Sequence, residues 1–174
     1  MSEAKEFVFH FGGHTDSLTA EIGKPFTVFT EDAFGGRINS INAKPRELVP
    51  YPRINPLTGP IFIENVRAGD ILAVHFLSLQ PTRDWGVATA SPNFGLLSST
   101  RTTPNLQPEH EERVWIWKFD SDRQSLTTKA SNGSTLTAPF RPFHGTVGVA
   151  PAHGEVRLAV VPGDFGGNLD LPDI

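Results

Sequence analysis

The sequence of 174 residues contains no cysteine. This absence excludes a disulfide framework, a thiolate nucleophile and a cysteine-ligated zinc site. Long apolar runs are also missing, since no stretch approaches the roughly 20 residues that a membrane-spanning helix needs. The N-terminal sequence MSEAKEFVFH lacks the basic and apolar regions of a signal peptide. We therefore expect a cytoplasmic protein that does not bind a membrane.

Clusters of basic residues are absent as well. Fifteen Lys and Arg residues are scattered among nineteen Asp and Glu residues, for a formal net charge of −4. This distribution offers no electrostatic footprint for nucleic acid. The chain also lacks a Walker loop, a GxSxG elbow and an HExxH motif, which argues against phosphate-cradling NTPases, α/β-hydrolases and zincins.

Glycine and proline are abundant, with sixteen and fifteen residues spread along the chain. They leave little room for long helices. Between them, β-branched and aromatic residues alternate with a period of two, which is typical of strands. We expect a single β-rich domain over residues 1–174. Its fold would be mostly β, an antiparallel sandwich or barrel, with few or short helices. The predicted strands cover 25–32, 69–79, 113–120, 145–152 and 154–164, and a short helical turn is expected around 104–112.

Two candidate sites lie in the first forty residues. His14 and Asp16 are two residues apart, so on an extended chain both side chains face one ligand or metal. The plainer interpretation is that Asp16 caps a turn. The segment EDAFGGRI places Asp32 before Gly35 and Gly36, and these glycines allow a bound group to approach the backbone closely. Paired carboxylates such as Glu31 and Asp32 at the end of a strand also occur as simple surface charge.

Two further candidates lie near the C-terminus. His144 precedes a glycine at the start of the predicted strand over 145–152. The final segment, PGDFGGNLDLPDI, contains Gly166, Gly167, Asn168 and Asp170. Asn168 and Asp170 share a face if the chain is extended, and they offer oxygen atoms as ligands or hydrogen-bond acceptors. Of the other histidines, His75 fits a structural role, His110 a solvated face and His153 a turn.

The order of these segments resembles the acetamidase/formamidase family. The most specific block is NPLTGPIFIENVRAGDIL (55–72), and GVAPA and GGNLD follow it in specificity. The resemblance runs from about residue 10 to the last residue. It covers only the first half of the family's longer polypeptide, whose second half carries a segment rich in Gly, Asp and His.

The resemblance implies a β-rich hydrolase that cleaves the C–N bond of small linear amides. It also implies a divalent metal ion (zinc, calcium or magnesium), whose bound hydroxide would attack the amide. The tetrahedral oxyanion needs hydrogen-bond donors. The residues that we assign are Asp16, Asn168 and Asp170 to catalysis, Gly35, Gly36, Gly166 and Gly167 to the substrate and oxyanion, and His14, Asp32 and His144 to the metal.

The position of Ile174, just after the GGNLD segment, has three explanations. The chain is one product of processing, a split gene product, or a short relative that lost activity or forms its site between subunits. We favour a partner fragment from the second half of the family, or a neighbouring subunit, that completes the site. An autocatalytic cut would expose a Ser, Thr or Cys nucleophile after Ile174 and would need no metal. We also expect a homo-oligomer.

Two other classes of function remain open. The first is a non-catalytic β-module that binds a small ligand or a protein partner. The second is a sugar-binding sandwich, suggested by Trp85, Trp115 and Trp117. Tryptophans two residues apart on a strand usually pack in a core, and no carboxylate pair is placed to act across a glycosidic bond. The second class is therefore disfavoured.

Overall fold

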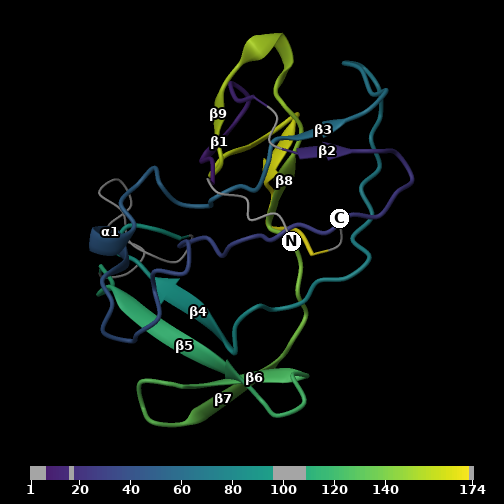
Figure 1. Ribbon diagram of the computed structural model, residues 1–174. Helices are drawn as coiled ribbons and strands as arrows, with labels where there is room; N and C mark the ends of the chain where they lie inside the picture. Colours follow the sequence, from purple (N-terminus) through teal and green to yellow (C-terminus); the bar gives the residue numbers. More distant parts are fainter. Residues whose placement is uncertain (1–6, 16–17, 96–108, 173–174) are drawn as a thin grey trace. The chain divides into compact units, whose positions relative to one another are not determined.

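The computed structural model describes residues 7–15, 18–95 and 109–172 (Figure 1). The chain divides into two compact units. Unit 1 comprises residues 1–36, 51–79 and 142–174, and unit 2 comprises residues 37–50 and 80–141. The expectation of a single domain stays a prediction.

Unit 1 is built from short strands around a three-stranded antiparallel sheet in the order β10-β11-β8. In this sheet Gly166 of β11 pairs with Gly148 of β8 on one side and Gly163 of β10 on the other. Two further pairs are the antiparallel β1 and β9 and the parallel β2 and β3. The elements of unit 1 are β1 (His10–Phe11), β2 (Leu18–Ala20), β3 (Ile61–Ile63), β8 (Thr146–Gly148), η1 (Ala152–Gly154), β9 (Arg157–Leu158), β10 (Pro162–Gly163) and β11 (Gly166–Asn168).

The close packing of β11 explains the adjacent glycines of GGNLD. A Cβ atom at Gly166 would lie 2.5 Å from the carbonyl oxygen of Val147, and one at Gly167 would lie 2.6 Å from that of Val161. Both glycines also have positive φ, 99° and 91°, which side chains disfavour. The buried Phe165 precedes them, and its ring lies 5.2 Å from that of Phe11. The glycine pair therefore allows the central strand to fit between its neighbours.

Unit 2 contains a four-stranded antiparallel meander in the order β4-β5-β6-β7. On one face of the sheet, Trp115 lies opposite Ala88 and Trp117 opposite Gly86, so the large rings have small cross-strand neighbours. On the other face, Val114 is buried. The elements of unit 2 are α1 (Pro45–Leu48), β4 (Trp85–Ala90), β5 (Arg113–Phe119), β6 (Ser125–Lys129) and β7 (Thr135–Pro139).

The β-rich architecture with antiparallel sheets and short helices is confirmed. The strand predicted over 113–120 is confirmed, and those predicted over 145–152 and 154–164 form only in part. The strands predicted over 25–32 and 69–79 are wrong, because neither segment joins a ladder in the described chain. An alternating pattern makes a strand only where a second strand accepts its hydrogen bonds. The predicted helical turn lies largely outside the described residues, and residues 109–112 are not helical.

None of the helices in the described part of the chain has the length and apolar character to span a membrane.

Candidate functional site

The described residues that the sequence assigns to the site all belong to unit 1. They are His14, Asp32, Gly35, Gly36, His144, Gly166, Gly167, Asn168 and Asp170. Asp16 and its neighbour Ser17 lie outside the described residues.

Asp32 closes a tight turn in the EDAFGG segment. Its Oδ1 accepts hydrogen bonds from the backbone N–H groups of Phe34 at 2.8 Å and Gly36 at 3.2 Å. The N–H of Gly35 donates to the backbone carbonyl of Asp32 at 2.9 Å. Gly35 and Gly36 both have positive φ, which such a turn requires. The N–H groups that we assigned to an oxyanion therefore already donate to Asp32, and the oxyanion role of these two glycines stays a prediction.

Asn55 joins this turn to strand β11. Its backbone N–H donates to the carbonyl oxygen of Ala33 at 2.8 Å, and its Nδ2 donates to Oδ1 of Asn168 at 3.1 Å. Asn55 has a φ of 58°, a left-handed conformation that asparagine tolerates better than most residues. Sequence reasoning missed this residue. The signal was present, because Asn55 begins the NPLTGP block, the most specific part of the resemblance.

Asn168 is the centre of this hydrogen-bond network. Its Oδ1 accepts from Asn55 and also from Oγ1 of Thr146 at 2.8 Å, while its Nδ2 donates to the carbonyl oxygen of Val160 at 3.4 Å. An amide oxygen has two lone pairs, so both are used. The Asn168 amide thus links β11 to β8, to Asn55 and to the segment before β10. The assignment of Asn168 to catalysis stays a prediction.

Asp170 turns back over the start of β8. The backbone N–H groups of Leu169 and Asp170 both donate to the carbonyl oxygen of Gly145 at 3.0 Å. The φ of Asp170 is 50°, so the extended conformation assumed from the sequence is wrong at this residue. The Asp170 carboxylate occupies the space that a Cβ atom of Gly145 would take, and the residue is exposed. Asp170 therefore offers a solvent-accessible carboxylate next to the Asn168 network.

Two histidines of unit 1 favour the neutral form. The His14 ring stacks on that of His10 at 4.0 Å, and partial burial together with the charge of His10 lowers the pKa of His14. The His144 ring lies 4.7 Å from the Phe76 ring, and burial lowers the pKa of His144. Neutral imidazoles can accept a proton or bind a metal ion.

The described residues do not supply a complete metal site. Over residues 7–15, 18–95 and 109–172, no group of three or more His, Asp or Glu side chains is placed to hold a metal ion. The structure therefore does not gather His14, Asp32 and His144 into one ligand set. Their assignment to a metal stays a prediction.

Comparison with known proteins identifies the family. A sequence model of the Acetamidase/Formamidase family matches residues 14–157. The chain belongs to the acetamidase/formamidase family. The crystal structure of an acetamidase from Yersinia enterocolitica is similar to the chain, with a TM-score of 0.81 and 35% sequence identity. The similarity covers 98% of this chain and 51% of that acetamidase, so the chain spans about half the length of its relative. No curated protein sequence matches.

The resemblance to the acetamidase/formamidase family that the sequence motifs indicate is therefore confirmed. The family match includes the Asp32 turn, Asn55 and the Gly145–Thr146 segment. Gly166, Gly167, Asn168 and Asp170 lie beyond it and join this region through the hydrogen bonds described above. Hydrogen bonds thus connect the EDAFGG, NPLTGP and GGNLD segments of unit 1.

The Asn55 side chain is expected to contribute to the stability of this family member. Asn55→Gly keeps the left-handed backbone and removes one donor to Asn168, so we expect a loss of about 1–2 kcal/mol in the free energy of unfolding. Asn55→Ala should lose about 1 kcal/mol more, because alanine disfavours a φ of 58°. Urea denaturation of the two variants measures both effects.

Asn65 provides the matched control. It is an exposed asparagine with a φ of 64° and makes no side-chain hydrogen bond to another described residue. Asn65→Gly should change the free energy of unfolding by less than about 0.5 kcal/mol. Equal losses at Asn55 and Asn65 would show that the bond to Asn168 contributes nothing.

The half-buried His144 is expected to make stability depend on pH. Its pKa in the folded protein lies below the ordinary histidine value of 6.5, so the unfolded chain binds more protons just below that pH. The contribution of His144 to the free energy of unfolding should therefore be fully present above about pH 6.5. It should decrease as the pH falls toward the pKa of His144 in the folded protein. Thermal unfolding between pH 8 and pH 5 should show a weaker pH dependence for His144→Gln than for the wild type. The same substitution at the exposed His110 provides the control, and an unchanged slope in His144→Gln would exclude this role.

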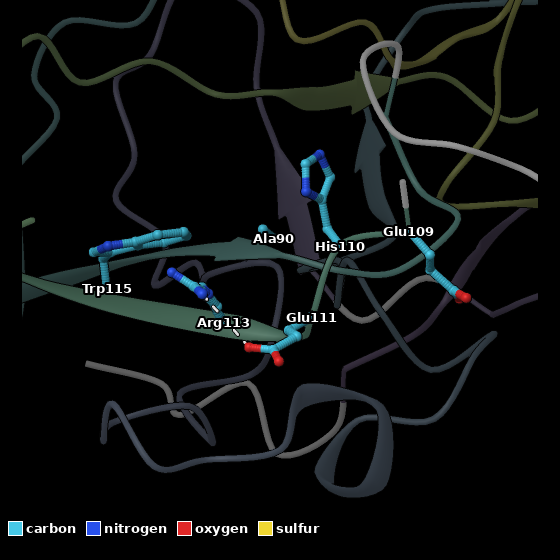
Figure 2. A pocket seen from close by; sticks show the side chains of 6 residues that line it. All are labelled: Ala90, Glu109, His110, Glu111, Arg113 and Trp115. Carbon is cyan, nitrogen blue, oxygen red and sulfur yellow. Dashed lines mark hydrogen bonds and ion pairs between the residues drawn. The ribbon is translucent and has the colours of Figure 1, made fainter. Parts of the chain in front are cut away.

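A pocket lies in unit 2, beside strands β4 and β5 (Figure 2). Its volume is about 460 Å³, and it is lined by Ala90, Glu109, His110, Glu111, Arg113 and Trp115. Two lining carboxylates already have polar partners, since Glu111 forms an ion pair with Arg113 at 3.5 Å and Glu109 accepts from Asn93 at 2.7 Å. None of the residues that the sequence assigns to the site lines this pocket. His110 is exposed, as expected for a solvated face.

Proposed function

We propose that the chain forms part of an amidohydrolase that hydrolyses the C–N bond of small linear amides. The products are a carboxylate and ammonia or an amine. Membership of the acetamidase/formamidase family supports this class of reaction. The observation that carries the proposal is the network around Asn168, which connects the Asp32 turn, the Gly145–Thr146 segment and Asp170, all parts of the chain that carry the family resemblance.

Hydrolysis of an amide requires a base that activates water and donors that stabilise the oxyanion. We assign the first task to the exposed carboxylate of Asp170, together with Asp16. The proton of the attacking water passes to a carboxylate oxygen and then to the leaving nitrogen. Asn168 acts as a positioning residue, because its amide oxygen accepts two hydrogen bonds and its Nδ2 donates a third.

The oxyanion donors are the missing part of this site. The N–H groups of Gly35 and Gly36 donate to Asp32. Gly166 and Gly167 belong to a central strand, whose peptide groups face the strands on both sides. We therefore propose that a second polypeptide segment completes the site. This segment corresponds to the half of the acetamidase that the similarity does not cover, and it is supplied by the same gene product, a companion chain or a neighbouring subunit.

A divalent metal ion remains part of the proposal only if other residues help to bind it. When bound, such an ion would lower the pKa of a ligating water. Removal of the metal with a chelator tests this point separately from the amidase activity.

The test is an assay of a panel of amides: formamide, acetamide, propionamide and an anilide. The chain is assayed alone and together with the second half of the Yersinia enterocolitica acetamidase, with and without chelator, and intact-mass spectrometry checks for a companion polypeptide. We expect hydrolysis of at least one small amide only when the second segment is present. Absence of ammonia release in a stable, stoichiometric complex would refute the proposal and favour a binding module.

A further inference from the structure

We infer that residues 71–77, an extended segment with no partner strand in the described chain, bind the second polypeptide segment by pairing with one of its strands. This inference rests on the proposed function in one respect, the existence of that second segment. It concerns the surface through which the two pieces associate. Figure 1 shows this part of the chain as an extended tube without an arrow, in the teal section between β3 and β4.

The segment has the sequence of a strand that is buried on both faces. In ILAVHFL, one side carries Leu72, Val74 and Phe76 and is wholly apolar, while the other side is apolar except for His75. Such continuous apolar runs are typical of strands covered on two sides. A hydrogen-bonded turn directly precedes the segment. The N–H of Asp70 donates to the carbonyl of Arg67 at 3.0 Å, and the N–H of Arg67 donates to the Asp70 carboxylate at 2.8 Å.

The apolar side chains of this segment are nevertheless exposed. Ile71 is 100% exposed, Leu77 is 79% exposed and Val74 is 56% exposed. Leu72 and Phe76 are also accessible to solvent. Five large apolar side chains within seven residues are thus exposed on the two sides of the segment, and exposed apolar surface of this kind marks a surface for association.

The backbone of the segment is available for pairing as well. Within the described chain, residues 71–77 take part in no sheet ladder and in no backbone hydrogen bond with other residues. An extended chain with unpaired N–H and C=O groups is a template for another strand. The other wrongly predicted strand, over 25–32, is less available, because the carbonyl of Phe29 accepts from Thr58 Oγ1 at 2.6 Å.

The position of the segment links it to the candidate site. The Phe76 ring lies 4.7 Å from the His144 ring, and His144 directly precedes Gly145, next to which the Asp170 carboxylate lies. A strand that pairs along residues 71–77 therefore brings new residues close to Asp170. This is where the proposed reaction still needs oxyanion donors.

The occupant is the second half of the acetamidase rather than a second copy of this chain. The similar acetamidase has about half of its length outside the similarity, while the fold of this chain matches the remainder with a TM-score of 0.81. In that acetamidase the other half belongs to the same chain as the part that resembles this one. A second copy of the chain brings no residues of that half to Asp170.

Hydrogen–deuterium exchange tests the inference without measuring hydrolysis. The probe is the second half of the Yersinia enterocolitica acetamidase, co-expressed with the 174-residue chain. In the chain alone, the amides of residues 71–77 should exchange at nearly the rate of an unstructured peptide. In the complex they should exchange at least ~100-fold more slowly, as expected for amides in a stable ladder.

Two variants make the test specific. Val74→Asp places a charge in the proposed interface and should lower the amount of co-purified second half at least ~10-fold. Ile22→Asp alters an exposed apolar residue of unit 1 outside the segment and should leave it unchanged. Circular dichroism checks that both variants fold.

Fast exchange at residues 71–77 in a stoichiometric complex would overturn the inference. Protection that increases with concentration in the chain alone would also overturn it, because a second copy would then be the occupant. A protected segment in an inactive complex would refute the proposed function and leave this interface standing.

Discussion

Gly166→Ala is expected to lower the free energy of unfolding by about 3 kcal/mol or more, from two separate causes. The new Cβ would lie 2.5 Å from the carbonyl oxygen of Val147, which belongs to the neighbouring strand β8. Real Cβ atoms do not approach so closely, so the two strands must separate. The φ of 99° adds backbone strain for any residue with a side chain. Urea denaturation of the purified variant, with detection by circular dichroism, measures the loss.

Glycines with positive φ and free space separate the two causes. Gly23 and Gly35 have φ values of 78° and 64°, and a Cβ atom at either position meets nothing within 4 Å. Gly23→Ala and Gly35→Ala should therefore lose only about 1–2 kcal/mol, the cost of a left-handed conformation. If Gly166→Ala loses no more than these variants, the close approach of β11 to β8 is not a constraint on the fold.

Asp170→Ala is expected to reduce kcat/KM for a small amide by about 10²–10⁴-fold in the assembled protein, the usual contribution of a general base. The substitution removes the exposed carboxylate beside Gly145 and leaves the Asn168 network in place, because Asp170 joins this region through its backbone N–H. Steady-state kinetics on the best substrate of the panel measures the loss. Thermal unfolding should show only the loss of about 1 kcal/mol that alanine incurs at a φ of 50°.

Two further variants define the role of Asp170. Glu64→Ala removes another exposed carboxylate of unit 1 and should leave kcat/KM unchanged. Gly145→Ala places a methyl group where the Asp170 carboxylate lies and should displace that carboxylate without removing it. Gly145→Ala should therefore lower kcat and change KM little. Near-native turnover of Asp170→Ala would remove this residue from the mechanism.

The prediction of a β-rich fold from the sequence succeeded where the pattern was long and its partners are close in the chain. Strand β5 is an example, because RVWIWKF alternates over seven residues and pairs with β4 and β6. Its partner β6 follows after a short turn, so the sheet forms from neighbouring segments. Alternation and nearby turns are properties of the sequence itself.

The same pattern failed over residues 69–79. Alternation describes which side chains can face a core, and it does not specify which strand supplies the hydrogen bonds. The described chain has no strand in that place, so the segment stays extended and exposed. Here the sequence pattern indicates a strand whose partner we propose to lie in the second polypeptide segment.

The candidate site shows a similar division. The EDAFGG and GGNLD segments were recognised from the sequence, but their glycines serve a different purpose from the one expected. Gly35 and Gly36 allow the turn closed by Asp32, and Gly166 and Gly167 allow the close packing of β11. Asn55 was missed, because its bond to Asn168 spans 113 residues of sequence. No local sequence pattern predicts a contact over such a separation.

The sequence by itself determined the chemical character of this protein. The lack of cysteine, the many glycines and prolines, the alternating apolar runs and the order of the motifs lead to a β-rich member of the acetamidase/formamidase family. The tertiary structure decided which groups meet, because hydrogen bonds such as that between Asn55 and Asn168 depend on distances in space. It also decided that the strand predicted near residue 74 has no partner in the described chain, since pairing is a property of two segments and never of one.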